Sequence, residues 1–142
     1  MKKEIKTEII INATPSKVWD ILLNFEAYPS WNPFIQTIKG NPEVNNTIQV
    51  TIAPPEGSNM TFKPIILENE TNRKLVWEGK LFIRGFFDGK HRFDLFENEE
   101  GTTSFVHSEE FSGLLVGLFN LEKTKQGFVL MNESLKNRAE SD

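Results

Sequence analysis

Two histidines and one glutamate stand in stretches that alternate between apolar and polar residues. The stretch TTSFVHSEEF, residues 102–111, holds His107 and Glu109 on the face that also carries its two phenylalanines. The stretch FDGKHRFDLFE, residues 87–97, holds His91 on its aromatic face. Imidazole and carboxyl groups are the commonest general acids and bases, so these three residues are the candidate catalytic residues.

The two stretches follow each other closely and are expected to pair as an antiparallel hairpin. Because paired residues share a face, odd positions must meet odd positions. One register places His91 opposite His107, and the other places His91 opposite Glu109. Both registers need a connection of odd length or a bulge near NEEG, where Gly101 makes either one easy.

An inward carboxyl group among phenylalanines costs free energy unless it has a hydrogen-bond or ion-pair partner or stays hydrated. The pattern therefore predicts a cavity with apolar walls and a few convergent polar groups, which is how small-molecule sites are built. The glycines at 79, 89 and 127 would leave room for it. The residues expected to contact a ligand are Trp31, Asn32, Trp77, His91, Phe93, Phe105, His107, Glu109, Phe111, Phe128 and Met131.

Other roles stay open for these residues. The histidine and glutamate cluster could support the fold through hydrogen bonds, orient a ligand, act as acid and base, or bind a metal as two histidines and one carboxylate. We expect neither a metal nor a cofactor. Trp31 and Asn32 could line the cavity mouth, or close the core and end a helix. Phe82, Phe86 and Phe87 could form a lid.

The elements that must position these side chains follow from hydrophobic periodicity. Residues 3–11 form a strand, and Thr14 caps a short helix that begins at Pro15. A second short helix lies between the prolines at 29 and 33. Further strands are expected at 34–40, 47–53, 60–68, 73–83, 87–97 and 102–111, followed by a long amphipathic helix at 115–138. The fold class is α+β, with a curved antiparallel sheet around the last helix.

Length and composition narrow the function classes. The 142 residues predict one domain, 1–142, and the absence of cysteine removes disulfides and thiolate chemistry. The net charge of −4, without a basic cluster, argues against nucleic acid as a partner. No stretch approaches the roughly 20 apolar residues of a membrane span, so we expect a cytoplasmic protein.

The whole chain resembles the SRPBCC superfamily, in particular its START-like and polyketide cyclase/dehydrase-like branch. The resemblance is carried by WNPFI at 31–35, DGKHRFDLF at 88–96, TTSFVHSEEFSGLL at 102–115 and GFVLMNESLKNRAE at 127–140. It implies a helix-grip fold: a seven-stranded antiparallel sheet wrapped around a long C-terminal helix, with two short helices after the first strand. It transfers no catalytic residue, because no motif specific to one enzyme is present.

Three functions follow as expectations. The first is binding of a small hydrophobic or aromatic molecule between sheet and helix. The second is a polyketide cyclase- or dehydratase-like enzyme that uses the cavity histidines and glutamate as acid and base. The third is a stress-response protein that partners a chaperone, as some proteins of this fold do. Non-enzymatic binding by a monomer or homodimer is favoured.

Overall fold

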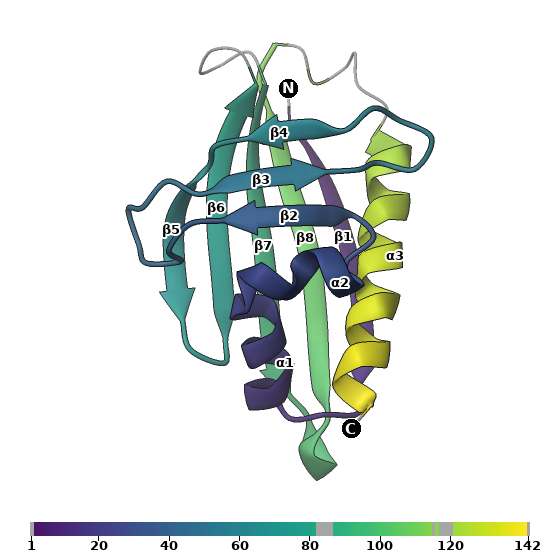
Figure 1. Ribbon diagram of the computed structural model, residues 1–142. Coiled ribbons are helices and arrows are strands. Elements are labelled where there is room, and N and C mark those ends of the chain that lie inside the picture. Colours follow the sequence, from purple (N-terminus) through teal and green to yellow (C-terminus); the bar gives the residue numbers. More distant parts are fainter. Residues whose placement is uncertain (1, 82–86, 115, 117–120, 142) are drawn as a thin grey trace.

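Two antiparallel sheets and one long helix surround the interior of the protein (Figure 1). The computed structural model describes residues 2–81, 87–114, 116 and 121–141. The elements are β1 (Lys2–Ile11), α1 (Pro15–Leu23), η1 (Phe25–Ala27), α2 (Tyr28–Trp31), β2 (Ile35–Lys39), β3 (Gln49–Ile52), β4 (Met60–Phe62), β5 (Ile65–Glu70), β6 (Lys74–Leu81), β7 (Phe87–Glu97), η2 (Glu99–Gly101), β8 (Thr103–Ser112) and α3 (Leu121–Glu140).

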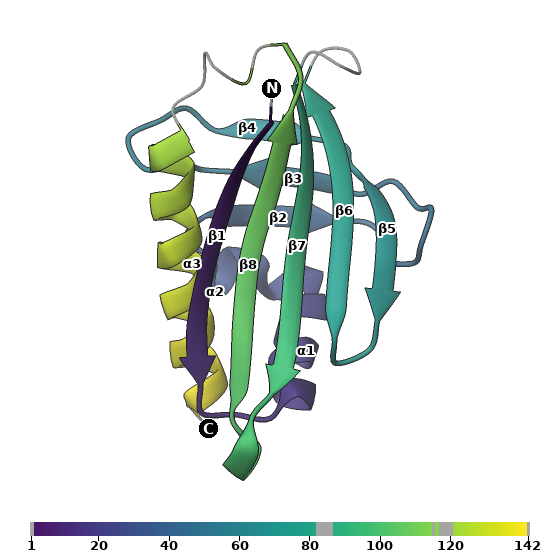
Figure 2. The same cartoon turned by 180° about the vertical axis from the view of Figure 1, so that it is seen from behind.

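The larger sheet has the strand order β1-β8-β7-β6-β5 and forms one wall, as Figure 2 shows from behind. Of the two registers open from the sequence, the structure has the one that pairs His91 with Glu109. Glu97 pairs with Thr103, so five residues connect β7 to β8, the odd number that this register needs. Within that connection Gly101 has a φ of 78°, which glycine adopts without strain.

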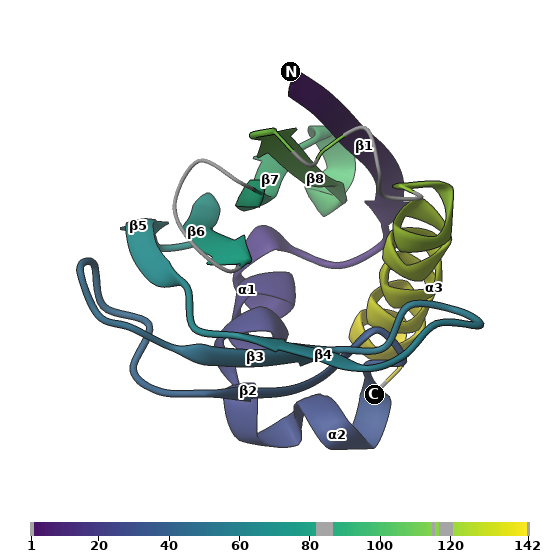
Figure 3. The same ribbon diagram turned by 90° about the horizontal axis from the view of Figure 1, so that it is seen from above.

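The smaller sheet, β2-β3-β4, crosses in front of the larger one (Figures 1 and 3). The single seven-stranded sheet expected from the resemblance is therefore corrected to five strands plus three. The expected strand at 60–68 divides at Pro64 into β4 and β5. Proline has no N–H for a ladder, and it biases the residue before it, so the chain leaves one sheet there and enters the other.

The helices close the remaining sides. Thr14 caps α1 as predicted, because its hydroxyl accepts a hydrogen bond from the Lys17 N–H at 3.2 Å. The helix α3 runs beside β1 (Figure 3), and its buried side chains join both sheets in one core. It spans Leu121–Glu140, and residues 115 and 117–120 of the helix expected at 115–138 lie outside the described residues. The expected α+β helix-grip fold is confirmed.

Gly127 lets the smaller sheet approach α3. A β-carbon at this position would lie 2.2 Å from Cδ1 of Phe34, the residue that precedes β2. The Phe34 ring in turn packs edge-on against Phe128, with ring centroids 5.5 Å apart. The close approach of the Phe34 ring therefore explains this glycine, which does not line the cavity described below.

We predict that Gly127→Ala destabilises the protein, although alanine is ordinarily the better helix former. The added methyl group must displace the Phe34 ring, and overpacking of this kind costs about 1–3 kcal/mol. Urea denaturation measures the effect on the free energy of unfolding. Gln126→Ala, at the exposed neighbouring position, is the control and should stay within about 0.5 kcal/mol. A G127A protein at least as stable as the parent contradicts the account.

Candidate ligand-binding cavity

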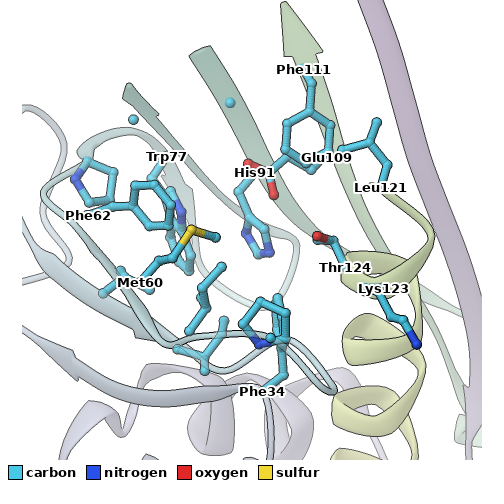
Figure 4. Close-up of a pocket in the computed structure, with 18 of the residues that line it drawn as sticks. Phe34, Met60, Phe62, Trp77, His91, Glu109, Phe111, Leu121, Lys123 and Thr124 are labelled. Carbon is cyan, nitrogen blue, oxygen red and sulfur yellow. The ribbon is translucent and has the colours of Figure 1, made fainter. Parts of the chain in front are cut away.

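A cavity of about 270 Å³ lies between the two sheets and the start of α3 (Figure 4). Its volume is near the lower end of the roughly 300–1,000 Å³ typical of small-molecule sites. Most of its wall is apolar. The lining residues are Phe34, Ile35, Val50, Ile52, Pro54, Gly57, Ser58, Met60, Phe62, Pro64, Trp77, Gly79, Gly89, His91, Glu109, Phe111, Leu121, Lys123 and Thr124.

Glu109 is a carboxylic acid in this apolar wall. One of its carboxyl oxygens lies over Gly89 on the neighbouring strand, so close that a β-carbon there would be 2.3 Å from it. Among the described residues it has no hydrogen-bond or ion-pair partner. Burial raises the pKa of Glu109 from the usual 4.5 to about 8, because the charged form loses its hydration. At pH 7 the protonated form, which can donate a hydrogen bond, is therefore favoured.

Behind the wall, a chain of hydrogen bonds joins four side chains from four elements. Nε2 of His91 on β7 lies 2.7 Å from Nε2 of His107 on β8. Nδ1 of His107 lies 2.9 Å from Oδ1 of Asn132 on α3. The Asn132 amide donates to the hydroxyl of Thr7 on β1 at 2.8 Å, and this hydroxyl donates to the His107 carbonyl at 2.9 Å.

The far end of the chain fixes the direction of every bond in it. A carbonyl can only accept, so the Thr7 hydroxyl donates to it and accepts from the Asn132 amide nitrogen. The Asn132 oxygen then faces His107, whose Nδ1 must carry a proton. Nε2 of neutral His107 is left as an acceptor, so His91 donates from its own Nε2. Nδ1 of neutral His91 therefore carries a lone pair.

Both imidazoles are held neutral by their surroundings. His91 stacks on Trp77 at 4.4 Å, and His107 stacks on Phe128 at 3.9 Å between ring centroids. Burial lowers the pKa of His107 to about 3, although its hydrogen bond to the Asn132 oxygen acts in the opposite sense. Burial is also the main cause that lowers the pKa of His91 well below its usual value, and the neighbouring His107 lowers it further. Nδ1 of His91 is buried without a partner among the described residues.

The structure places the expected ligand contacts in two groups. Trp77, His91, Glu109 and Phe111 line the cavity. The second group lies outside its lining and is buried in the core, where several members surround the histidine pair. This group consists of Phe93, Phe105, His107, Phe128 and Met131.

Trp31 and Asn32 also lie outside the lining, at the end of α2. The Asn32 oxygen accepts hydrogen bonds from the N–H groups of Phe34 and Ile35, at 2.9 and 2.8 Å. This local motif ends the helix and turns the chain into β2. The ring of Trp31 packs against Tyr28, with centroids 5.1 Å apart. Of the two roles open for this pair, the geometry matches the structural one.

Sequence reasoning missed the opposite wall of the cavity, which the smaller sheet supplies. Val50 and Ile52 alternate with Thr51, and Met60 and Phe62 alternate with another threonine in β4. This period of two was a usable signal, but it does not tell which sheet the strands join. The start of α3 was missed too, because polar residues such as Lys123 and Thr124 were not expected in an apolar wall.

Among the described residues, no group of three histidine, aspartate or glutamate side chains is arranged to hold a metal ion. The expected lid involves Phe82 and Phe86, which lie outside the described residues, and Phe87, whose side chain is not described. The described helices include none with the length and apolarity of a membrane span.

Comparison with known proteins identifies the family of this chain. The sequence model described as "Polyketide cyclase / dehydrase and lipid transport" matches residues 2–140. The chain belongs to this family. The expected membership of the SRPBCC superfamily, with its START-like and polyketide cyclase-like branch, is thereby confirmed. No curated protein matches the sequence.

Solved structures of this family's fold are similar over nearly the whole chain. A START superfamily protein from Mycobacterium smegmatis has a TM-score of 0.75 at 17% identity, covering 96% of this chain and 97% of its own. Major latex-like protein 151 from Panax ginseng has a TM-score of 0.79 at 10% identity, covering 99% of both. The di-domain ARO/CYC StfQ of the steffimycin biosynthetic pathway has a TM-score of 0.71 at 11% identity, covering 99% of this chain and 51% of its own.

We predict that Glu109 makes the protein less stable as the pH rises from 6.5 to 8. Between its unfolded pKa of 4.5 and its folded pKa of about 8, the folded state binds one more proton than the unfolded chain. Its contribution is complete below pH 4.5 and is lost through pH 8, by at most about 1.4 kcal/mol per pH unit. The lowered pKa values of the histidines act in the opposite sense below pH 6.5, so the window lies above it.

Urea denaturation at several pH values in this window measures the slope. Glu109→Gln should flatten it, because the amide does not titrate. Glu110→Gln, which removes the exposed neighbouring carboxyl group, is the matched control and should keep the slope of the parent protein. Equal slopes in all three proteins contradict the raised pKa of Glu109.

Proposed function

We propose that this protein binds a small apolar or aromatic molecule in the cavity between its two sheets and α3. The observation that carries the proposal is the cavity itself, about 270 Å³ in volume, with apolar walls and few polar groups. A cavity of this size that served only folding would cost stability, because its lining atoms lose packing partners. Occupancy by an apolar ligand offsets that cost. Membership of a family described by cyclase, dehydrase and lipid-transport functions supports the proposal.

A second candidate is acid–base catalysis on such a molecule. One observation favours it: the wall holds a neutral carboxylic acid, Glu109, opposite a neutral imidazole, His91, whose Nδ1 carries a lone pair. Environments that push two pKa values apart in this way typically separate an acid from a base. The pKa of His91 is held so low, however, that the imidazole is a weak base at pH 7. The enzyme candidate requires Glu109→Gln to abolish turnover and leave affinity within about twofold.

We predict that N-phenyl-1-naphthylamine, a neutral apolar dye, binds with one-to-one stoichiometry and gains fluorescence. Ile52→Trp, which adds an indole ring where Ile52 lines the cavity, should weaken binding at least about tenfold, since the lost volume excludes the dye. Fluorescence titration measures the affinity, and circular dichroism checks that the variant is folded.

The matched control is Ile10→Trp, at a position on β1 that is 50% exposed. It adds the same ring away from the cavity and should leave the affinity unchanged. Equal loss of affinity in both variants, or none in either, contradicts the location of the site. A cytoplasmic location and a monomeric or homodimeric state stay predictions.

A further inference from the structure

The cavity has one polar end. Glu109, His91 and Thr124 lie together where β7 and β8 face α3, and Met60 and Phe62 lie across from them on the smaller sheet (Figure 4). Gly89 leaves the space that the Glu109 carboxyl group occupies at this wall, because any side chain at position 89 would displace the carboxyl group. A ligand whose apolar part fills the cavity therefore meets its hydrogen-bonding groups at this end.

The residues that the structure describes place no positive charge at this polar end. Protonation of His91 to the cation would cost much free energy, because its Nε2 already donates to His107 and aromatic side chains enclose both rings. Among the described lining residues Lys123 is the one cation, and its ammonium group is bound to Glu56. Figure 4 shows that ammonium group directed away from His91 and Glu109.

The available hydrogen bonds suit a hydroxyl group. The neutral Glu109 carboxyl donates one hydrogen bond and accepts others, and a hydroxyl group can do both in return. Nδ1 of His91, on the residue paired with Glu109, is a further acceptor without a partner among the described residues. A carboxylate offers only acceptors, so it would lose its hydration and gain only uncharged donors, the Glu109 carboxyl and the Thr124 hydroxyl.

We infer that the cavity selects neutral ligands that carry a hydroxyl group at the Glu109 end and excludes ligands that carry a carboxylate there. The inference rests on the proposed function, because it specifies the class of molecule that the same cavity binds. Hydroxylated aromatic or alicyclic compounds meet the requirement. Fatty acids and other apolar acids in their ionised form do not.

Three probes of nearly equal shape test the inference at pH 6.5: 2-methylnaphthalene, 2-naphthalenemethanol and 2-naphthoate. Each is titrated against bound N-phenyl-1-naphthylamine. The alcohol should bind at least as tightly as the methyl compound, since a buried hydroxyl group without a hydrogen bond would weaken its binding. The alcohol should bind at least about tenfold more tightly than the carboxylate.

Two matched substitutions assign the preference to one residue. Glu109→Leu removes the hydrogen-bonding group and should weaken the alcohol about tenfold relative to the methyl compound. Glu110→Leu, which makes the same change at the exposed neighbouring position, should leave the ratio as in the parent protein. The ratio of the two probes cancels any general effect of a substitution on the cavity.

The outcomes separate this inference from the function on which it rests. If neither the dye nor 2-methylnaphthalene binds, the proposed function fails and the inference fails with it. If both bind but 2-naphthoate binds as tightly as the alcohol, the cavity function stands and the selectivity is wrong. An unchanged alcohol-to-methyl ratio in E109L also overturns the inference.

Discussion

The hydrogen bond between His91 and His107 is the constraint on which the rest of the interior depends. Two imidazoles 2.7 Å apart cannot both carry a proton at Nε2, so one must donate and the other must accept. The Asn132 oxygen decides which, and Thr7 holds the amide in that orientation. This chain of hydrogen bonds thereby connects α3 to three strands of the larger sheet, and removal of any one partner would leave a buried polar group without a hydrogen bond.

This constraint also sets the chemistry of the cavity. Because the histidines stay neutral, none of the described residues places a positive charge near Glu109, and burial favours the protonated form of its carboxyl group at pH 7. The polar end of the site is thus made of neutral groups whose donors and acceptors are fixed in advance. Such preorganisation lowers the cost of orienting a ligand, and an apolar wall supplies most of the binding free energy.

Alternation alone predicted the inward faces of β7 and β8, since a period of two leaves no other arrangement once the aromatics are buried. It left the register open, and the five-residue connection decides it in favour of His91 opposite Glu109. Asn132 was missed even though it stands four residues after Phe128 on the apolar stripe of α3, where both contact His107. The second sheet was missed because the break at Pro64 depends on which strands lie nearby, and local sequence does not contain that information.

The most direct measurement is the nitrogen-15 NMR spectrum of the imidazole rings, followed from pH 7 to pH 5. The protein has only two histidines, and the contact between His91 and Trp77 tells them apart. We predict that His91 carries its proton on Nε2, that His107 carries its proton on Nδ1, and that neither gains a second proton in this range. Two identical tautomers, or a histidine that titrates near its usual pKa of 6.5, would contradict it.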